Sequence, residues 1–291
     1  PAPALPAGDA ARLALLAPMI SPQDYAAAFA RTRDYIAAGD CYQINLTFPI
    51  RSRLISGSAQ ELYAALAARQ PVGFGAYADL GQGPVVVSRS PELFFRLDAQ
   101  GRIEARPMKG TAPRDPDPAR DAALAAGLAA SEKNRAENLM IVDLLRNDLG
   151  RSCRIGSVRV PQLFALESYP NVHHLVSCVT GELADGHDAF DLLAGSFPGG
   201  SITGAPKIRA MQIIDELEPV RRGIYAGAVG YFAWGGRTMD TAIAIRTLVA
   251  VGGRAFVQAG AGVVADSVPA TEYEETLAKA RALLRVLAAP S

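Results

Sequence analysis

Arg106-Pro107-Met108-Lys109-Gly110-Thr111 places a lysine between a proline and a glycine, directly after an alternating stretch that predicts a strand over 102–106. Proline restricts its own φ, and glycine adopts backbone conformations that other residues avoid, so the pair predicts a defined bend at Lys109. An amine held at such a bend suits a reactive group. A solvated turn lysine has the same local sequence, so the rest of the chain must decide between the two interpretations.

Strands and helices alternate irregularly around this bend. Strands are predicted at 41–48, 73–80, 84–88, 93–97, 102–106, 154–160, 172–183, 226–234, 241–251 and 254–258. Those between 73 and 106 are separated by Gly, Pro and Asp-rich turns, which is typical of an antiparallel meander. Helices are predicted from Ser21-Pro22 to Gly39, at 60–70, from 132 to 149 behind a Ser131 cap, after Lys207 and from Thr271. We expect a loose lead-in over 1–20 and one domain over 21–291.

The composition excludes several classes of partner. Lys+Arg and Asp+Glu are both 29, so no net field attracts nucleic acid or an acidic membrane surface. Three widely spaced cysteines form neither a disulfide framework nor a zinc pattern, which fits a reducing compartment. No segment has the unbroken apolar length of a membrane helix. The Pro- and Ala-rich start lacks the basic region followed by an apolar region that is typical of a signal peptide. These features predict a cytoplasmic protein.

Several polar residues are candidates for a site. Gln43 and Asn45 share one face of a strand, and Glu92 opens a strand that turns back toward Lys109. Each also fits a plainer role, a solvated strand face or an exposed turn carboxylate. The neighbouring His173 and His174 point to opposite faces of their strand, so at most one of them can serve a given site.

The long helix over 132–149 carries a second set of candidates. Leu139, Val142, Leu145 and Leu149 are spaced for a core-facing stripe. Asn134, Glu137 and Ile141 follow another face, so Glu137 could look into a cleft.

Two further stretches carry groups suited to an anion or a cation. The glycine-rich loop over 197–207 leads into a helix, where backbone N–H groups favour an anion, but it lacks P-loop spacing. Carboxylate binding and a tight structural turn remain open for it. In the last helix Glu272, Glu275 and Lys279 lie on one stripe, either a solvated face or a carboxylate half-site for Mg²⁺.

Three long blocks, in order, resemble the signature segments of the chorismate-utilising enzymes. They are Glu137 to Asp148, Pro198 to Lys207, and Ala265-Asp266-Ser267 with Glu272-Tyr273-Glu274-Glu275. The resemblance covers nearly the whole chain from Ser21. It implies an α+β fold like that of anthranilate synthase component I, with two large antiparallel sheets packed as a sandwich and helices outside. The family's N-terminal part is expected to be largely absent.

The resemblance also implies a role for each matching residue. Glu137 and Glu275, with Glu272 nearby, would hold a Mg²⁺ ion that binds the ring carboxylate of chorismate. Glu92 matches the general acid that protonates the departing hydroxyl, for which a raised pKa is needed. Lys109 matches a lysine that attacks C2 of the ring, with direct attack by ammonia as the alternative. The matching substrate-binding positions are Gln43, His174, Ser201, Tyr225, Arg246, Gly260, Gly262 and Lys279.

Lys109 also selects a branch within the family. With lysine at this position the chain resembles the aminodeoxychorismate synthases, whereas anthranilate synthases typically carry alanine there. The resemblance implies amination of chorismate at C4, with ammonia from a glutamine amidotransferase, on the route to para-aminobenzoate and folate. Gln43 argues for an amine nucleophile, because relatives that use water have lysine at that position. Two departures are Asn134, where relatives usually have an acidic residue, and Met108 in place of isoleucine. Anthranilate synthesis and a non-catalytic chorismate-binding subunit are the alternatives.

Overall fold

The computed structural model describes residues 11–14, 17–70, 72–170 and 172–284. They form two compact units. The first contains the chain up to Pro91, 202–229 and the chain from Ile243 onward, and the second contains Glu92–Ser201 and Gly230–Ala242. Each unit is therefore assembled from segments that are distant in sequence. One catalytic domain over 21–291 stays a prediction.

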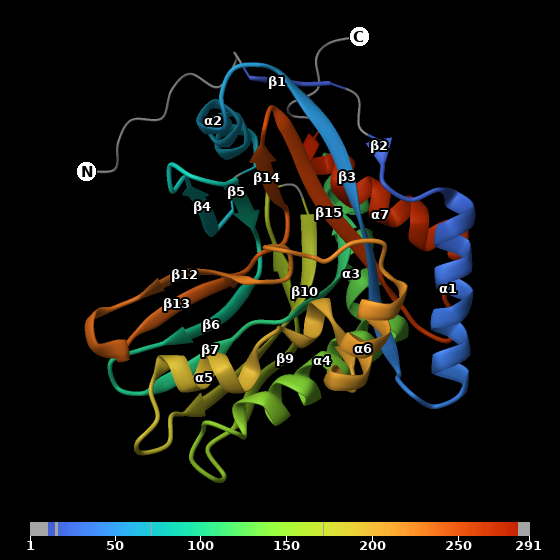
Figure 1. Ribbon diagram of the computed structural model, residues 1–291. Helices are drawn as coiled ribbons and strands as arrows, with labels where there is room; N and C mark the ends of the chain where they lie inside the picture. Colours follow the sequence, from blue (N-terminus) through green and yellow to red (C-terminus); the bar gives the residue numbers. More distant parts are fainter. Residues whose placement is uncertain (1–10, 15–16, 71, 171, 285–291) are drawn as a thin grey trace. The chain divides into compact units, whose positions relative to one another are not determined.

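An antiparallel sheet forms the centre of the first unit. Its strand order is β1-β3-β15-β14-β5-β4, and β2 and β11 also pair with β3. The strands are β1 (Arg12–Leu13), β2 (Ala17–Pro18), β3 (Gln43–Ser56), β4 (Phe74–Ala78), β5 (Val85–Ser90), β11 (Gly204–Ala205), β14 (Thr247–Val251) and β15 (Arg254–Val263). The pairing of β3 with β15 runs from Arg53 opposite Arg254 to Ile44 opposite Val263, and Figure 1 shows the two strands side by side.

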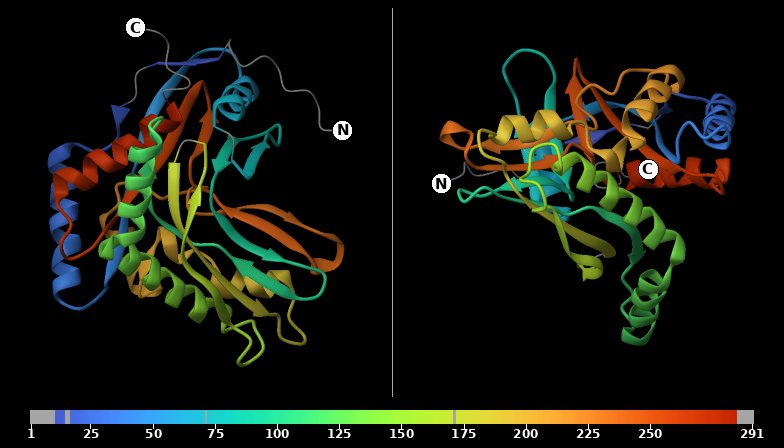
Figure 2. Two further views of the ribbon diagram at one scale, coloured as in Figure 1. Left: turned by 180° about the vertical axis from the view of Figure 1, so that it is seen from behind. Right: turned by 90° about the horizontal axis from the view of Figure 1, so that it is seen from below.

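Four helices of the described chain belong to this unit: α1 (Pro22–Ala37), α2 (Ala59–Arg69), α6 (Lys207–Leu217) and α7 (Pro269–Leu284). The Ser21 side chain accepts a hydrogen bond from the N–H of Asp24, which confirms the predicted cap of α1. Figures 1 and 2 show α1 and α7 next to each other. Tyr25 of α1, Phe48 of β3 and Tyr273 of α7 pack their rings together, with centroids 5.1–5.5 Å apart. This aromatic contact joins both helices to the sheet.

Part of the predicted lead-in pairs with the sheet. β1 and β2 lie within residues 1–20, where a loose segment was expected, and both pair with β3. Ala11 and Leu13 are buried in the core of the unit. Two-residue strands produce no detectable periodicity, which explains why the sequence does not reveal them. The lead-in positions 1–10 and 15–16 lie outside the described residues.

A second antiparallel sheet has the strand order β12-β13-β6-β7-β10-β8, with β9 also paired to β10. Its strands are β6 (Leu93–Leu97), β7 (Arg102–Ala105), β8 (Met108–Pro113), β9 (Arg159–Ser168), β10 (Val172–Glu182), β12 (Ala228–Phe232) and β13 (Met239–Ile243). The meander predicted over 73–106 is wrong as a single sheet, because β4 and β5 pair in the first sheet while β6 and β7 pair in this one. Strand periodicity identifies each strand but not the sheet to which it belongs.

The sequence prediction omitted two of the helices described in the second unit, those over 118–130 and 189–196. The helices of this unit are α3 (Pro118–Ala130), α4 (Glu132–Leu149) and α5 (Ala189–Ser196). Short 3₁₀ turns are η2 (Trp234–Gly236), in the same unit, and η1 (Gly200–Ile202), whose last residue belongs to the first unit. The helices predicted from the sequence include none between 70 and 132, and the proline-rich stretch 113–118 fits neither a helix nor a strand pattern. Asp117 caps α3 through the N–H of Ala119, and Pro118 occupies its first turn. This Asp-Pro start is a helix signal that the proline-rich context conceals.

The predicted bounds of α4 are confirmed, but the predicted core face is partly wrong. Ile141, which was assigned to the cleft face, is buried, and Leu139, assigned to the core, is 43 % exposed. Asn138 explains the rotation, because its side chain is buried and donates to the carbonyl oxygen of Leu175 on β10 at 3.2 Å. A polar residue thus occupies a core position that an apolar pattern cannot reveal.

The predicted fold class is confirmed as α+β, with two antiparallel sheets and accompanying helices. Each sheet supplies several of the predicted site residues. A search of the described helices for one with the length and hydropathy of a membrane span finds none.

Candidate functional site

The predicted site residues fall into two groups, one in each unit. The second unit carries Glu92, Lys109, Glu137, His174 and Ser201, and the first carries Gln43, Tyr225, Arg246, Gly260, Gly262, Glu272, Glu275 and Lys279. Each group is described within its own unit. All of these residues lie in the described part of the chain.

Glu92 is buried immediately before β6. Its exposed fraction is 5 %, so it is not the exposed turn carboxylate that its local sequence also allowed. Burial disfavours a charged carboxylate relative to the neutral acid. The position is therefore compatible with the predicted proton donor.

Lys109 lies in β8 and is half-buried. Its Nζ donates to the carbonyl oxygen of Ser201 at 3.3 Å, so two predicted residues from distant segments of this unit come together. Ser201 is 8 % exposed, and its hydroxyl has no hydrogen-bond partner among the described residues. A buried hydroxyl without a partner is uncommon in folded proteins and marks a place where a ligand group can bind.

The bend after Lys109 is present. Gly110 has a φ of +85°, the left-handed region that favours glycine. A Cβ at this position would lie 2.9 Å from Cγ of Asn134 and 3.0 Å from Cδ1 of Leu128. Helices α3 and α4 therefore leave no room for a side chain here, and the bend that orients Lys109 depends on glycine.

His174 and His173 make different contacts. Nδ1 of His174 lies 3.0 Å from Oγ1 of Thr111, the residue opposite it on β8. Nδ1 of His173 lies 2.8 Å from the Ser168 hydroxyl, and its Nε2 lies 3.0 Å from the Asp121 carboxylate. The predicted substrate-contacting histidine is thus held by β8, whereas its neighbour belongs to a separate network.

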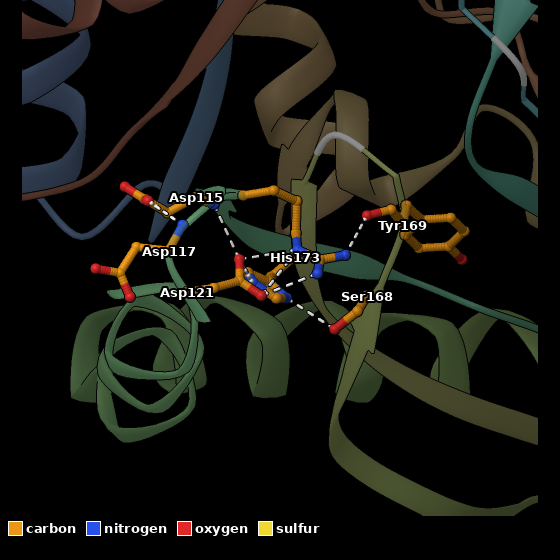
Figure 3. A network of polar contacts seen from close by, with 7 residues as sticks. Asp115, Asp117, Asp121, Ser168, Tyr169 and His173 are labelled. Carbon is orange, nitrogen blue, oxygen red and sulfur yellow. Dashed lines mark hydrogen bonds and ion pairs between the residues drawn. The ribbon is translucent and has the colours of Figure 1, made fainter. Parts of the chain in front are cut away.

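That separate network is centred on Asp121 of α3 (Figure 3). Arg114 Nε donates to both carboxylate oxygens at 2.9 and 3.1 Å, and the N–H of Asp115 donates at 3.0 Å. These donors, the Arg114 side chain first, hold the pKa of Asp121 well below its usual range. Together with His173 they join the 113–118 segment and α3 to β10, so we assign this network a structural role.

Glu137 projects from α4 and is half-buried. The next residue, Asn138, also accepts a hydrogen bond from the Ser177 hydroxyl at 2.5 Å. Ser177 in turn accepts from the N–H of Phe164 at 3.1 Å. This buried network anchors α4 on β9 and β10 and thereby determines the direction in which Glu137 points.

Gln43 of the first unit is fully buried. Its exposed fraction is 0 %, and both its amide nitrogen and its amide oxygen lack partners within the described chain. A Cβ on Gly262 would lie 2.5 Å from this amide nitrogen, so only glycine fits beside it. A solvated strand face is therefore wrong for Gln43. An amide buried without partners is costly unless a ligand completes its hydrogen bonds.

The predicted residues of α7 and β15 are in direct contact. Lys279 Nζ donates to the carbonyl oxygen of Gly260 at 3.1 Å and lies 2.8 Å from the Glu275 carboxylate. Glu272, one turn before Glu275, is buried. Burial raises the pKa of Tyr25, and the negative charges of Glu272 and Glu275 raise it further, so both carboxylates act on the same phenol.

Tyr225 and Arg246 occupy unusual stretches of backbone. Tyr225 is buried and precedes Ala226, whose φ is +66°. Arg246 is exposed with a φ of +48°, and its carbonyl oxygen accepts from the N–H of Arg89 at 3.1 Å. Such conformations are uncommon for residues with a Cβ and cluster at functional sites.

A magnesium site remains a proposal. The predicted ligands have the oxygen donors that Mg²⁺ prefers, and Glu272 and Glu275 lie one turn apart on α7. Among the residues that the structure describes, no group of three or more His, Cys, Asp or Glu side chains is suited to hold a metal ion. Glu137 belongs to the other unit.

A buried ion pair in the first unit was not predicted from the sequence. Glu218 and Arg222 lie 2.7 Å apart, and Arg222 donates to the carbonyl oxygen of Asn45 at 2.6 Å. The i, i+4 spacing is a possible signal, but it occurs equally on solvated helix surfaces.

Comparison with known proteins identifies relatives over nearly the whole chain. The family model described as chorismate binding enzyme matches residues 2–285. The chain is 49 % identical over 265 residues to aminodeoxychorismate synthase component 1 of Escherichia coli (strain K12), covering 91 % of this chain and 58 % of that protein. It is 51 % identical over 256 residues to anthranilate synthase component 1 of Streptomyces coelicolor, covering 88 % and 49 %. The chain thus spans about half the length of these relatives.

Solved structures give the same picture of the fold. Anthranilate synthase component I from Streptococcus pneumoniae TIGR4 aligns with a TM-score of 0.85 at 37 % identity, covering 94 % of this chain and 60 % of that one. The menaquinone-specific isochorismate synthase MenF from Escherichia coli aligns with a TM-score of 0.84 at 22 % identity, covering 98 % and 65 %. The second likeness concerns the fold alone.

Proposed function

Because the chain belongs to the chorismate binding enzymes, we propose that it converts chorismate and ammonia to 4-amino-4-deoxychorismate, as an aminodeoxychorismate synthase component I. The observation that carries this proposal is Lys109, a half-buried amine on β8 within Pro107–Thr111. Its amine contacts the carbonyl oxygen of Ser201, whose buried hydroxyl lacks a hydrogen-bond partner among the described residues.

Overall identity does not separate this function from anthranilate synthesis. Relatives of both names match at similar levels, 49 % and 51 % in the two examples above. Residue 109 is the discriminating position, because the sequence resemblance associates lysine with amination at C4 and alanine with anthranilate synthesis. We therefore rank anthranilate synthase component I second.

The proposed chemistry uses Lys109 and Glu92. The neutral amine of Lys109 attacks C2 of chorismate, the ring double bonds shift, and the C4–O bond breaks as Glu92 donates a proton to the departing hydroxyl, which leaves as water. Ammonia then attacks C4, the double bonds shift back, and the C2–N bond breaks to release Lys109. A bound Mg²⁺ would neutralise the ring carboxylate and withdraw electron density from the ring.

The other proposed residues bind and orient the substrate. In the first unit, Gln43 offers an amide whose donor and acceptor lack partners among the described residues, and Arg246 offers a guanidinium suited to a carboxylate. In the second, His174 offers a ring held through Nδ1 by Thr111. Ammonia would come from a glutamine amidotransferase, a partner that we propose from the family resemblance.

Product identification tests the proposal. The protein is incubated with chorismate, Mg²⁺ and ammonium, and products are identified by mass. We expect an aminated product that retains the enolpyruvyl group. Anthranilate with pyruvate would replace the proposal by the second candidate, and binding of chorismate with no product would indicate a non-catalytic subunit.

The Lys109→Ala variant tests the nucleophile. We expect loss of amination by added ammonium, because alanine supplies no amine to attack C2. Lys133→Ala on the exposed side of α4 is the matched control and should retain activity. Full activity of the Lys109→Ala variant would contradict the covalent route and support direct attack by ammonia.

A further inference from the structure

We propose that the Glu218–Arg222 ion pair is a positioning element for the chorismate-binding segments of the first unit, an inference that rests on the proposed function. The pair follows α6 and is almost fully withdrawn from solvent, with 2 % of the Glu218 side chain and 12 % of the Arg222 side chain exposed. Removing two charges from water is costly unless hydrogen bonds of good geometry compensate for it. The contacts of this pair show where that compensation comes from.

The pair acts as a substitute strand on one edge of β3. Along this edge Gln43 and Ile44 pair with β11, and Ile50 and Arg51 pair with β2. Between these pairings the N–H of Thr47 donates to Glu218 at 2.8 Å, and the carbonyl oxygen of Asn45 accepts from Arg222 at 2.6 Å. A carboxylate and a guanidinium thus satisfy the backbone groups that a neighbouring strand would otherwise pair.

The other edge of β3 carries the predicted substrate-binding glycines. In the register of β3 with β15, Asn45 lies opposite Gly262 and Thr47 lies opposite Gly260. The two backbone positions held by the ion pair are therefore the two that face these glycines. A Cβ on Gly260 would lie 2.4 Å from Cγ2 of Thr47, which shows how closely the strands approach.

Arg222 reaches two more segments. Its NH1 group donates to the carbonyl oxygen of Ile202 at 2.5 Å, in the glycine-rich loop, and its guanidinium carbon lies 5.8 Å from the ring centroid of Tyr225. Asn45 also donates to the Ile202 oxygen, at 3.1 Å. The Arg222 guanidinium therefore contacts β3, the glycine-rich loop and Tyr225, which is a predicted substrate-binding residue.

A purely apolar contact could hold the same elements together, but it would not determine their spacing. Hydrogen bonds from a planar guanidinium have fixed directions, so they specify the distance between the Asn45 and Ile202 oxygens. We infer that the pair acts through these backbone groups and does not touch substrate. Its loss should weaken chorismate binding more than it lowers the rate of the bound complex.

The decisive variant is the double substitution Glu218→Gln with Arg222→Met. Glutamine still accepts from the Thr47 N–H, and methionine removes the buried positive charge, so neither partner is left as an unpaired ion. Chorismate binding is measured by calorimetry with Mg²⁺ and without ammonium. We expect the dissociation constant to rise about tenfold, while the protein still unfolds cooperatively at a lower melting temperature because the Asn45 and Ile202 oxygens lose the Arg222 donors. An unchanged dissociation constant would overturn the proposal.

Amide hydrogen exchange gives a readout that does not depend on chorismate. In the double variant we expect faster exchange at 43–47 and 258–263, with unchanged exchange at 248–250 of β14 as the internal control. If the parent protein binds no chorismate, the proposed function fails and exchange alone decides: unchanged exchange at both segments overturns the positioning role.

A second variant covers the case in which the double variant does not fold. Arg222→Lys retains the positive charge beside Glu218, but one ammonium cannot reproduce the planar fork that reaches Asn45 and Ile202. We expect the same increase in exchange and weaker chorismate binding. Parent-like values for both measurements would show that charge alone is sufficient and would overturn the proposal.

Discussion

The ammonium group of Lys279 on α7 donates to the carbonyl oxygen of Gly260 on β15 at 3.1 Å. The same ammonium lies 2.8 Å from Glu275, one turn earlier on α7. A single side chain therefore connects a predicted metal ligand with a predicted substrate-binding strand. This connection makes Lys279 a sensitive point at which to test the site.

Lys279→Met should raise KM for chorismate by about tenfold and leave stability nearly unchanged. Both ends of the Lys279–Glu275 pair are half-exposed, and such pairs contribute about 0–1 kcal/mol. Steady-state kinetics and thermal unfolding provide the measurements, with Lys133→Met as the control. A large loss of stability with an unchanged KM would show that Lys279 is only structural.

Gly110→Ala should destabilise the fold by about 1–3 kcal/mol and reduce amination, because the new Cβ meets Asn134 and forces a left-handed φ on alanine. Gly127→Ala is the matched control. Gly127 lies within α3 with no atom within 4 Å of its added Cβ, so alanine there should stabilise by about 0.5–1 kcal/mol. Urea unfolding measures the change in the free energy of unfolding for both variants. A change of the same sign in the two variants would contradict the prediction.

Asp121→Asn should reduce the decrease in the free energy of unfolding that accompanies acidification. The folded-state pKa of Asp121 lies below its ordinary value because Arg114 and the Asp115 N–H donate to the carboxylate. Its ionised form therefore stabilises the fold above the unfolded pKa of about 4, and this contribution disappears as the pH falls toward the folded pKa. The variant should be less stable than the parent at neutral pH, and the difference should shrink as the solution is acidified.

Urea unfolding across this pH range measures that difference. The matched control is Asp143→Asn, because Asp143 pairs with Arg146 on the exposed side of α4. Its effect should be small. A constant difference between the parent and the Asp121→Asn variant at all pH values would contradict the assignment.

Asn138→Ala should destabilise the protein by about 2–3 kcal/mol, because it removes the acceptor of Ser177 and leaves the Leu175 carbonyl oxygen without this donor. The neighbouring Leu139→Ala, on an exposed position, should cost less. If α4 also turns, binding of Mg²⁺ through Glu137 should weaken. Calorimetric titration with Mg²⁺ checks this. Unaltered Mg²⁺ binding would show that the Asn138 network does not determine the position of Glu137.

Removal of divalent ions should abolish amination, and added Mg²⁺ should restore it, if the carboxylates of Glu137, Glu272 and Glu275 hold the ion. Glu275→Gln should weaken direct Mg²⁺ binding measured by calorimetry, since an amide is a poorer ligand than a carboxylate. Glu274→Gln, on the same helix, is the control. Equal Mg²⁺ affinity in both variants would remove Glu275 from the metal site.

Local sequence was sufficient to predict many helices and strands, but not the sheet or the core with which each of them packs. The Ser21 and Ser131 caps correctly locate the starts of α1 and α4, because a cap is a contact between residues three positions apart. The meander over 73–106 failed because alternation is the same whichever sheet a strand joins. Leu139 was misassigned because its neighbour Asn138 is held in the core by β10.

For this protein the sequence alone determined the family, the α+β class and the identities of the residues proposed for chemistry, because these depend on residue type and short-range order. Tertiary structure decided which of those residues meet: Lys109 with Ser201, Thr111 with His174, and Lys279 with Gly260. It also decided that Gln43 is buried without partners among the described residues, and that Glu218 and Arg222 complete the edge of β3. These contacts join segments far apart in the chain, and their burial depends on packing that no local pattern encodes.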